Sequence, residues 1–181
     1  MKWNILLLLT VAVFPAYAND YYTGIKVGIE ESNTSSSAST KFGIILGKRI
    51  HNNFDVEFVS KMKSIHSGGN GTKIEGGLIS KYRPFYIRTA IGNKYVSGRD
   101  NFGYWSIEGG SKIKIADKWS AAAGIRFRNA FNTKRNQKDH TFKMELGYKL
   151  TEFIGMSVSY DLKRARDSDA NSYGIGLKYE F

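Results

Sequence analysis

Large apolar residues alternate with small or charged residues along most of the chain. The last nine residues show the pattern most plainly. One set of alternate positions carries glycine, lysine and glutamate, and the other set carries Tyr173, Ile175, Leu177, Tyr179 and Phe181. Successive side chains of a β-strand point to opposite faces. Residues 173–181 are therefore predicted to form a strand with one apolar face and one small or charged face.

The same period of two predicts ten strands. They span residues 21–30, 42–50, 54–63, 72–82, 85–95, 102–115, 119–129, 140–150, 154–162 and 173–181. A tilted strand of about ten residues is long enough to cross a bilayer. The predicted fold class is therefore all-β, a single antiparallel transmembrane up-and-down β-barrel. A barrel of about eight strands is the alternative, in which the first strand and one neighbour belong to loops.

Short and long connections alternate between the predicted strands. Short turns are predicted at residues 51–53, 83–84, 116–118 and 151–152. Loops of six to ten residues are predicted at 31–40, 64–71, 96–101, 130–139 and 163–171. Transmembrane β-barrels carry short turns at one end and longer loops at the other. This rhythm therefore favours a barrel that spans a membrane.

Aromatic residues are predicted to lie near both ends of the strands. The end with the short turns carries Tyr21, Phe54, Tyr82, Phe85, Trp119, Tyr148, Phe153, Tyr179 and Phe181, and the opposite end carries Phe42, Tyr95, Trp105, Phe127, Phe142 and Tyr173. Amphipathic rings concentrate at the headgroup level of a bilayer. The competing interpretation, a secreted lipocalin-like barrel or β-sandwich, requires an apolar inward face, whereas this chain places glycine and charged residues there.

The first 18 residues have the parts of a secretory signal peptide. Lys2 supplies a positive charge, residues 5–14 form an apolar run, and Ala16-Tyr17-Ala18 ends in a cleavage pattern. The apolar run is too short for a transmembrane helix. We predict cleavage near Ala18 and one mature domain over residues 19–181.

Basic side chains outnumber acidic ones, 27 against 16. That balance alone suggests nucleic acid or anionic lipid as a partner. The strand register instead places most charges on the inward face, so we expect no nucleic-acid partner. The basic residues predicted to line the lumen are Lys26, Arg49, Lys73, Arg88, Lys112, Arg126, Arg128 and Lys143, and their predicted acidic partners are Glu57, Glu75, Glu108 and Glu145.

Two hypotheses follow for the lumen. Opposite charges could pair and fill it, because an unpaired charge in a packed interior costs several kcal/mol and barrels of about eight strands are just filled by side chains. The protein would then have a structural or surface role. Alternatively, the surplus of cations and the many inward glycines could line a narrow, water-filled pore that prefers anions.

Catalysis, a cofactor and a metal site find little support. The chain has no cysteine, which excludes disulfides and thiolate chemistry. His51 is predicted in a turn, His66 in a loop, and His140 at a strand end beside Asp139. Neither the histidines nor the loop carboxylates have the spacing of metal ligands. We therefore expect no enzyme activity, no cofactor and no metal.

The final strand, with Tyr179 and Phe181, resembles the C-terminal strand of bacterial outer-membrane β-barrels. The resemblance covers the mature chain and points to small barrels of the OmpA-type and surface-antigen kind. It implies that Tyr179 and Phe181 are an assembly signal for the barrel-assembly machinery, which the chain reaches with periplasmic chaperones. It further implies a monomer in the outer membrane of a Gram-negative bacterium, in contact with outer-membrane lipid and lipopolysaccharide.

Two narrower resemblances concern the lumen and the rim. The stretch Ile125-Arg126-Phe127-Arg128 is similar to the basic lining of the oligogalacturonate porins, which implies acidic sugars as solutes; this chain is short for the twelve strands of that family. The pair Asp139-His140 is similar to one half of the omptin protease arrangement, with Asp100, Asp167 and Asp169 as conceivable partners. A solvated loop histidine is the alternative for His140.

Overall fold

The computed structural model describes residues 20–33, 38–65, 70–132, 138–165 and 169–181. The predicted signal peptide lies outside these residues, as do parts of four predicted loops, including His66 and Asp167. No helix in the described part is long and apolar enough to cross a membrane.

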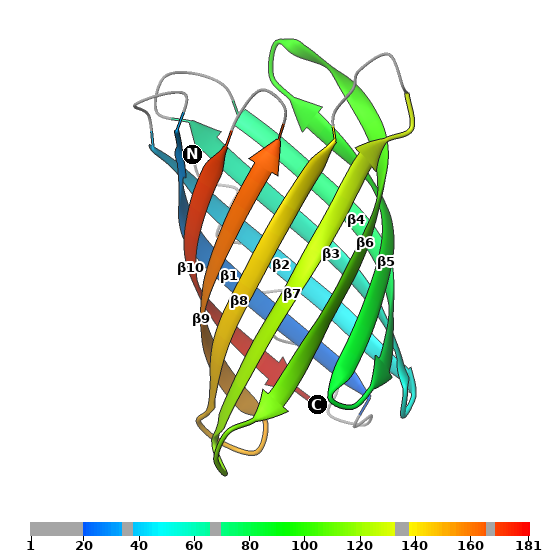
Figure 1. The fold of residues 1–181 in the computed structure, drawn as a ribbon, viewed down its shortest axis with the longest axis vertical. Coiled ribbons are helices and arrows are strands. Elements are labelled where there is room, and N and C mark those ends of the chain that lie inside the picture. Colours follow the sequence, from blue (N-terminus) through cyan, green and yellow to red (C-terminus); the bar gives the residue numbers. More distant parts are fainter. Residues whose placement is uncertain (1–19, 34–37, 66–69, 133–137, 166–168) are drawn as a thin grey trace.

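Ten antiparallel strands form a closed barrel (Figure 1). They are β1 (Tyr21–Ser32), β2 (Ala38–His51), β3 (Phe54–Ile65), β4 (Asn70–Tyr82), β5 (Phe85–Val96), β6 (Arg99–Lys114), β7 (Trp119–Ala130), β8 (Asp139–Lys149), β9 (Ile154–Ala165) and β10 (Ala170–Glu180). Each strand pairs with its neighbours in sequence, and β1 pairs with β10. The prediction of ten strands is confirmed, and the eight-strand alternative is wrong.

The first and last strands close the barrel through a long ladder. Their register runs from Tyr22 opposite Glu180 to Ser32 opposite Ala170. Tyr21 and Phe181 exchange two backbone hydrogen bonds of 3.0 and 2.9 Å, and their rings stack with centroids 6.2 Å apart. Closure leaves no strand edge with unpaired backbone groups, which a lipid-exposed sheet cannot tolerate.

The strands extend further at the loop end than predicted. β5 and β6 continue to Val96 and from Arg99, so the predicted loop at 96–101 is a tight turn in which Gly98 takes a φ of 73°. Glycine adopts this left-handed conformation without steric cost. The other predicted loops also lose residues to the strands, for example at 70–71 and 163–165. Hydrogen-bond pairing continues past the apolar belt, because backbone ladders do not need an apolar face.

The outward face of the strands is apolar and the inward face is small or charged, as predicted. Ile91, Ile125 and Ile175 are each at least 60% exposed, and they are among many large apolar side chains that point away from the lumen. The described residues include a small cluster of buried apolar side chains, made of Phe102, Tyr104 and Ala130. A water-soluble barrel has the opposite polarity, so this arrangement suits a lipid surrounding.

Three inward tyrosines lie over glycines of neighbouring strands. A methyl group at the glycine would overlap the tyrosine side chain in each of the pairs Tyr22 and Gly47, Tyr104 and Gly92, and Tyr86 and Gly110. The missing side chains therefore create the space that keeps these tyrosines against the wall of the barrel. This packing leaves the axis free of three large rings.

Each of these tyrosines also donates a hydrogen bond to an inward glutamate. The donor–acceptor distances are 2.8 Å from Tyr22 to Glu57, 2.9 Å from Tyr104 to Glu75 and 3.1 Å from Tyr86 to Glu108. The tyrosines therefore fix three carboxylates on the inner wall.

We expect Gly47→Ala to destabilise the barrel by about 1–3 kcal/mol, because the added methyl group overpacks the wall and displaces Tyr22. Gly43→Ala is the matched control, since it lies on the same face of β2 and its methyl group would approach no neighbour closer than 3.4 Å. Urea unfolding in detergent micelles, followed by tryptophan fluorescence, measures both. Equal effects of the two substitutions would contradict the packing described here.

Candidate functional site: the charged lumen

A cavity of about 450 Å³ runs through the lumen, and all ten strands contribute to its lining. Seven of the eight predicted basic residues line it, and so do all four predicted acidic residues. Arg49 does not line it. The lining extends from Lys112 on the turn side to Lys94 and Lys163 near the loop end, so the cavity follows much of the barrel axis.

Cations outnumber carboxylates in this lining by two to one. The six carboxylates belong to Glu30, Glu57, Glu75, Glu108, Glu145 and Asp161, and the twelve cations to Lys26, Lys41, Lys61, Lys63, Lys73, Arg88, Lys94, Lys112, Arg126, Arg128, Lys143 and Lys163. Alternation alone could show that these side chains point inward. Which of them meet depends on the tilt and register of the strands.

Arg88 is the centre of the strongest ion-pair group. Its Nη1 lies 2.6 Å from Glu75 Oε1 and its Nε 3.1 Å from Glu57 Oε2. Lys73 Nζ lies 2.7 Å from Glu75 Oε2. Arg88 and Glu75 are buried, 8% and 3% exposed. Because these residues come from β3, β4 and β5, which are adjacent in the barrel, the group follows the wall and does not cross the lumen.

The two remaining predicted acids have separate partners. Lys143 Nζ lies 2.7 Å from Glu108 Oε2, and Lys26 Nζ lies 3.5 Å from Glu145 Oε2. Lys143 and Glu108 sit on β8 and β6, with only β7 between them. The pair from β1 to β8 reaches further around the ring, and its side chains are 30% and 40% exposed. The predicted pairing of acids with inward cations is therefore present, mostly along the wall.

Two further inward acids, Glu30 and Asp55, hold cations at the two ends of the lumen. Glu30 pairs with Lys41 and also with Lys63, at 2.6 Å, near the loop end. Asp55 pairs with Lys81 near the turn end. Their inward direction follows from the alternation, but their partners lie on neighbouring strands and are set by register.

Asp139 and His140 do not form the half-site that their similarity to the omptin arrangement implies, because adjacent residues of a strand point to opposite faces. Asp139 points inward and pairs with Arg128. His140 packs against Phe127, with ring centroids 5.1 Å apart, next to Trp105 on the outer face. The described residues contain no group of three or more His, Asp or Glu side chains that could hold a metal ion.

Five of the cations that line the cavity form no ion pair with any residue that the structure describes. They are Lys61, Lys94, Lys112, Arg126 and Lys163. Arg126 donates from Nη2 to Thr141 Oγ1 at 3.2 Å. Lys94 Nζ lies 5.7 Å from the centre of the Phe102 ring. These charges need water or a bound anion.

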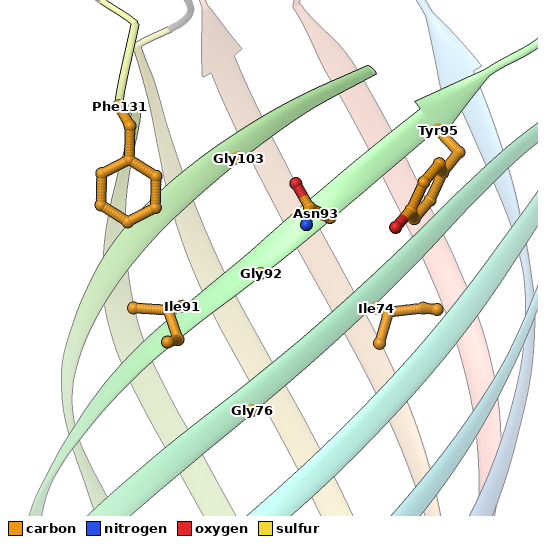
Figure 2. Close-up of a pocket in the computed structure, with 8 residues that line it drawn as sticks. All are labelled: Ile74, Gly76, Ile91, Gly92, Asn93, Tyr95, Gly103 and Phe131. Carbon is orange, nitrogen blue, oxygen red and sulfur yellow. The ribbon is translucent and has the colours of Figure 1, made fainter.

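The outer wall carries a separate groove over β4, β5 and β6 (Figure 2). Its volume is about 490 Å³, and it is lined by Ile74, Gly76, Ile91, Gly92, Asn93, Tyr95, Gly103 and Phe131. Asn93 is its polar side chain besides the Tyr95 hydroxyl, and none of its lining residues is charged. The groove faces away from the lumen and shares none of the lumen's charge chemistry.

Solved structures share this architecture. The translocator domain of the autotransporter NalP from Neisseria meningitidis has a TM-score of 0.56 at 8% identity, over 100% of this chain and 95% of that chain. The NanC porin has a TM-score of 0.53 at 11% identity, over 87% of this chain and 100% of that chain. An outer membrane channel from Pseudomonas putida F1 has a TM-score of 0.54 at 7% identity, over 93% of this chain and 100% of that chain. The chain has the fold of an outer-membrane β-barrel.

No family model and no curated protein sequence matches this chain. The KdgM porin, solved in complex with disordered oligogalacturonate, has a TM-score of 0.47 at 18% identity, over 87% of this chain and 99% of that chain. The resemblances to oligogalacturonate porins and to OmpA-type barrels stay predictions.

We expect Arg88→Met to destabilise the barrel by about 3–5 kcal/mol, because it removes a cation from two inward carboxylates, Glu57 and Glu75. Lys112→Met is the control, since Lys112 lines the same cavity without an ion pair in the described part of the chain, and we expect a change within about 0.5 kcal/mol. Urea unfolding in micelles compares the two. A loss of stability in Lys112→Met as large as that in Arg88→Met would contradict the assigned ion pairs.

Proposed function

We propose that the protein is an outer-membrane channel that passes small solutes and prefers anions. The observation that carries this proposal is the composition of the axial cavity, with twelve cations and six carboxylates. A pore lined by fixed positive charge attracts anions and repels cations. The protein acts without catalysis or a cofactor in this proposal.

The placement of the ion pairs supports an open axis. Arg88, Glu75 and Glu57 lie on three adjacent strands, and tyrosine hydroxyls hold both carboxylates from the wall side. Pairs held along the wall neutralise charge without filling the centre. The cations without carboxylate partners then have access to water, which an ion pathway requires.

The dimensions support a narrow channel. Barrels of about eight strands are just filled by side chains, and those of 16–18 strands hold a wide aqueous channel. This barrel has ten strands and an axial cavity of about 450 Å³. Small acidic solutes or short acidic oligosaccharides are the substrates that this size and charge favour.

The names of two similar structures, the NanC porin and an outer membrane channel, are in keeping with this proposal.

We further propose a monomer surrounded by outer-membrane lipid and lipopolysaccharide. Tyr179 lies near the end of β10 and Phe181 directly follows the strand, and their rings stack with centroids 5.5 Å apart. Their role as a signal to the barrel-assembly machinery remains a prediction.

A structural or surface-exposed barrel with a closed lumen is the second candidate. The observation that favours it is that Glu57, Glu75, Glu108 and Glu145 all have cationic partners. In that case the loops would carry the function, and the lumen would conduct no ions.

Charge reversal near the loop end tests the selectivity. Lys94→Glu and Lys163→Glu replace two cavity-lining cations that have no ion pair among the described residues. We expect the reversal potential in a salt gradient to shift toward cation preference, because the substitutions lower the positive potential of the lumen.

Lys118→Glu is the matched control, since it makes the same charge change in the exposed turn between β6 and β7. It should leave the reversal potential close to that of the wild type. A wild-type channel with cation preference, or equal shifts in all three variants, would contradict an anion-selective lumen.

A further inference from the structure

The middle of the lumen brings six cations and four carboxylates together. The carboxylates are Glu57, Glu75, Glu108 and Glu145, and the cations are Lys26, Lys61, Lys73, Arg88, Arg126 and Lys143. Lys61 lies in the electrostatic field of Lys143, Arg126, Glu75 and Lys26, and Lys73 in that of Arg126 and Lys61. These side chains therefore act on one another as one group.

Ion pairing neutralises all members of this group except two. Lys26, Lys73, Arg88 and Lys143 each have a carboxylate partner. Arg128, which also acts on Lys73, is neutralised by Asp139. Lys61 and Arg126 have no carboxylate partner in the described part of the chain. The middle of the lumen thus carries a surplus of two positive charges.

Lys61 lies in an unfavourable position unless an anion is present. It belongs to β3 and stands directly opposite Lys73 of β4 in the strand register. Like charges directly opposite each other destabilise a sheet. Lys73 is compensated by Glu75 at 2.7 Å, whereas Lys61 faces the added repulsion of Lys143 and Arg126.

Arg126 also lacks an ion-pair partner among the described residues, and it lies on another wall of the barrel. It belongs to β7, four strands from β3 in the ring of ten. Its side chain lines the cavity, only 9% of the residue is exposed, and its buried Nε has no hydrogen-bond partner. Its one described hydrogen bond goes to the hydroxyl of Thr141, which carries no charge. Glu108 stands opposite Arg126 in the strand register, but Lys143 Nζ already lies 2.7 Å from that carboxylate, so the two cations share one counter-charge. An uncompensated buried charge is costly.

We infer that Lys61 and Arg126 form an anion-binding site in the middle of the lumen that takes a small divalent oxyanion of the phosphate or sulfate class. Two surplus positive charges match a dianion. A guanidinium binds oxyanions through several directed hydrogen bonds, and an ammonium supplies a compact charge. The inference rests on the proposed function, because the ligand reaches the site through the lumen.

Binding of sulfate to the refolded, full-length mature barrel in detergent tests the site. Isothermal titration at constant ionic strength should show one saturable site in the wild type. Lys61→Gln and Arg126→Gln should each lower the affinity for sulfate by roughly tenfold to a hundredfold, because each removes a charged partner of the anion. Lys112→Gln removes a cavity-lining charge elsewhere in the lumen and should leave the affinity within about twofold.

Arg126→Lys covers the case in which Arg126→Gln does not fold. It keeps the charge and loses the guanidinium geometry, so we expect a smaller loss of affinity than in Lys61→Gln. No saturable sulfate binding by the wild type, or unchanged affinity in folded Lys61→Gln and Arg126→Lys, would overturn the inference.

Conductance measurements on the same preparations separate this inference from the proposed channel. An anion-selective conductance without sulfate binding overturns the site and leaves the channel. Sulfate binding that depends on Lys61 and Arg126 in a barrel without conductance supports the site and overturns the channel.

Discussion

The charged residues of this barrel must find their counter-charges inside a closed wall, because lipid-facing positions cannot supply them. Backbone closure between β1 and β10 makes the wall continuous, and the two-residue period sends almost every charge of the strands inward. Ion pairs, tyrosine hydroxyls, water and bound anions are then the available partners. The number and placement of cations in the lumen therefore determine what the barrel can do.

Glycine and tyrosine together decide how much of the lumen these partners occupy. Gly47, Gly92 and Gly110 leave room for tyrosine side chains against the wall, and the hydroxyls of these tyrosines hold glutamates there. Arg88 then pairs with two of those glutamates without leaving the wall. The same small residues that would weaken an isolated strand thus keep space along the axis for water and solute.

The period of two was sufficient to predict the number of strands and their two faces. Seven of the eight basic residues that it assigned to the lumen line the cavity, and Arg49 does not. Loop lengths were predicted poorly, because polar strand ends such as residues 96–101 keep pairing beyond the apolar belt. The ion-pair partners could not be predicted either. Lys143 meets Glu108 two strands away, a contact that depends on tilt and register. The same alternation, applied to Asp139 and His140, would have separated that pair.

The central claim is that the charges along the wall leave an open path for ions. The most direct measurement is the single-channel conductance of the barrel, refolded and inserted into a planar bilayer in symmetrical salt. Discrete, reproducible steps are the predicted result. A silent bilayer with protein that is folded, as judged by heat-modifiable migration on a gel, would contradict the claim and indicate a lumen closed by its own side chains.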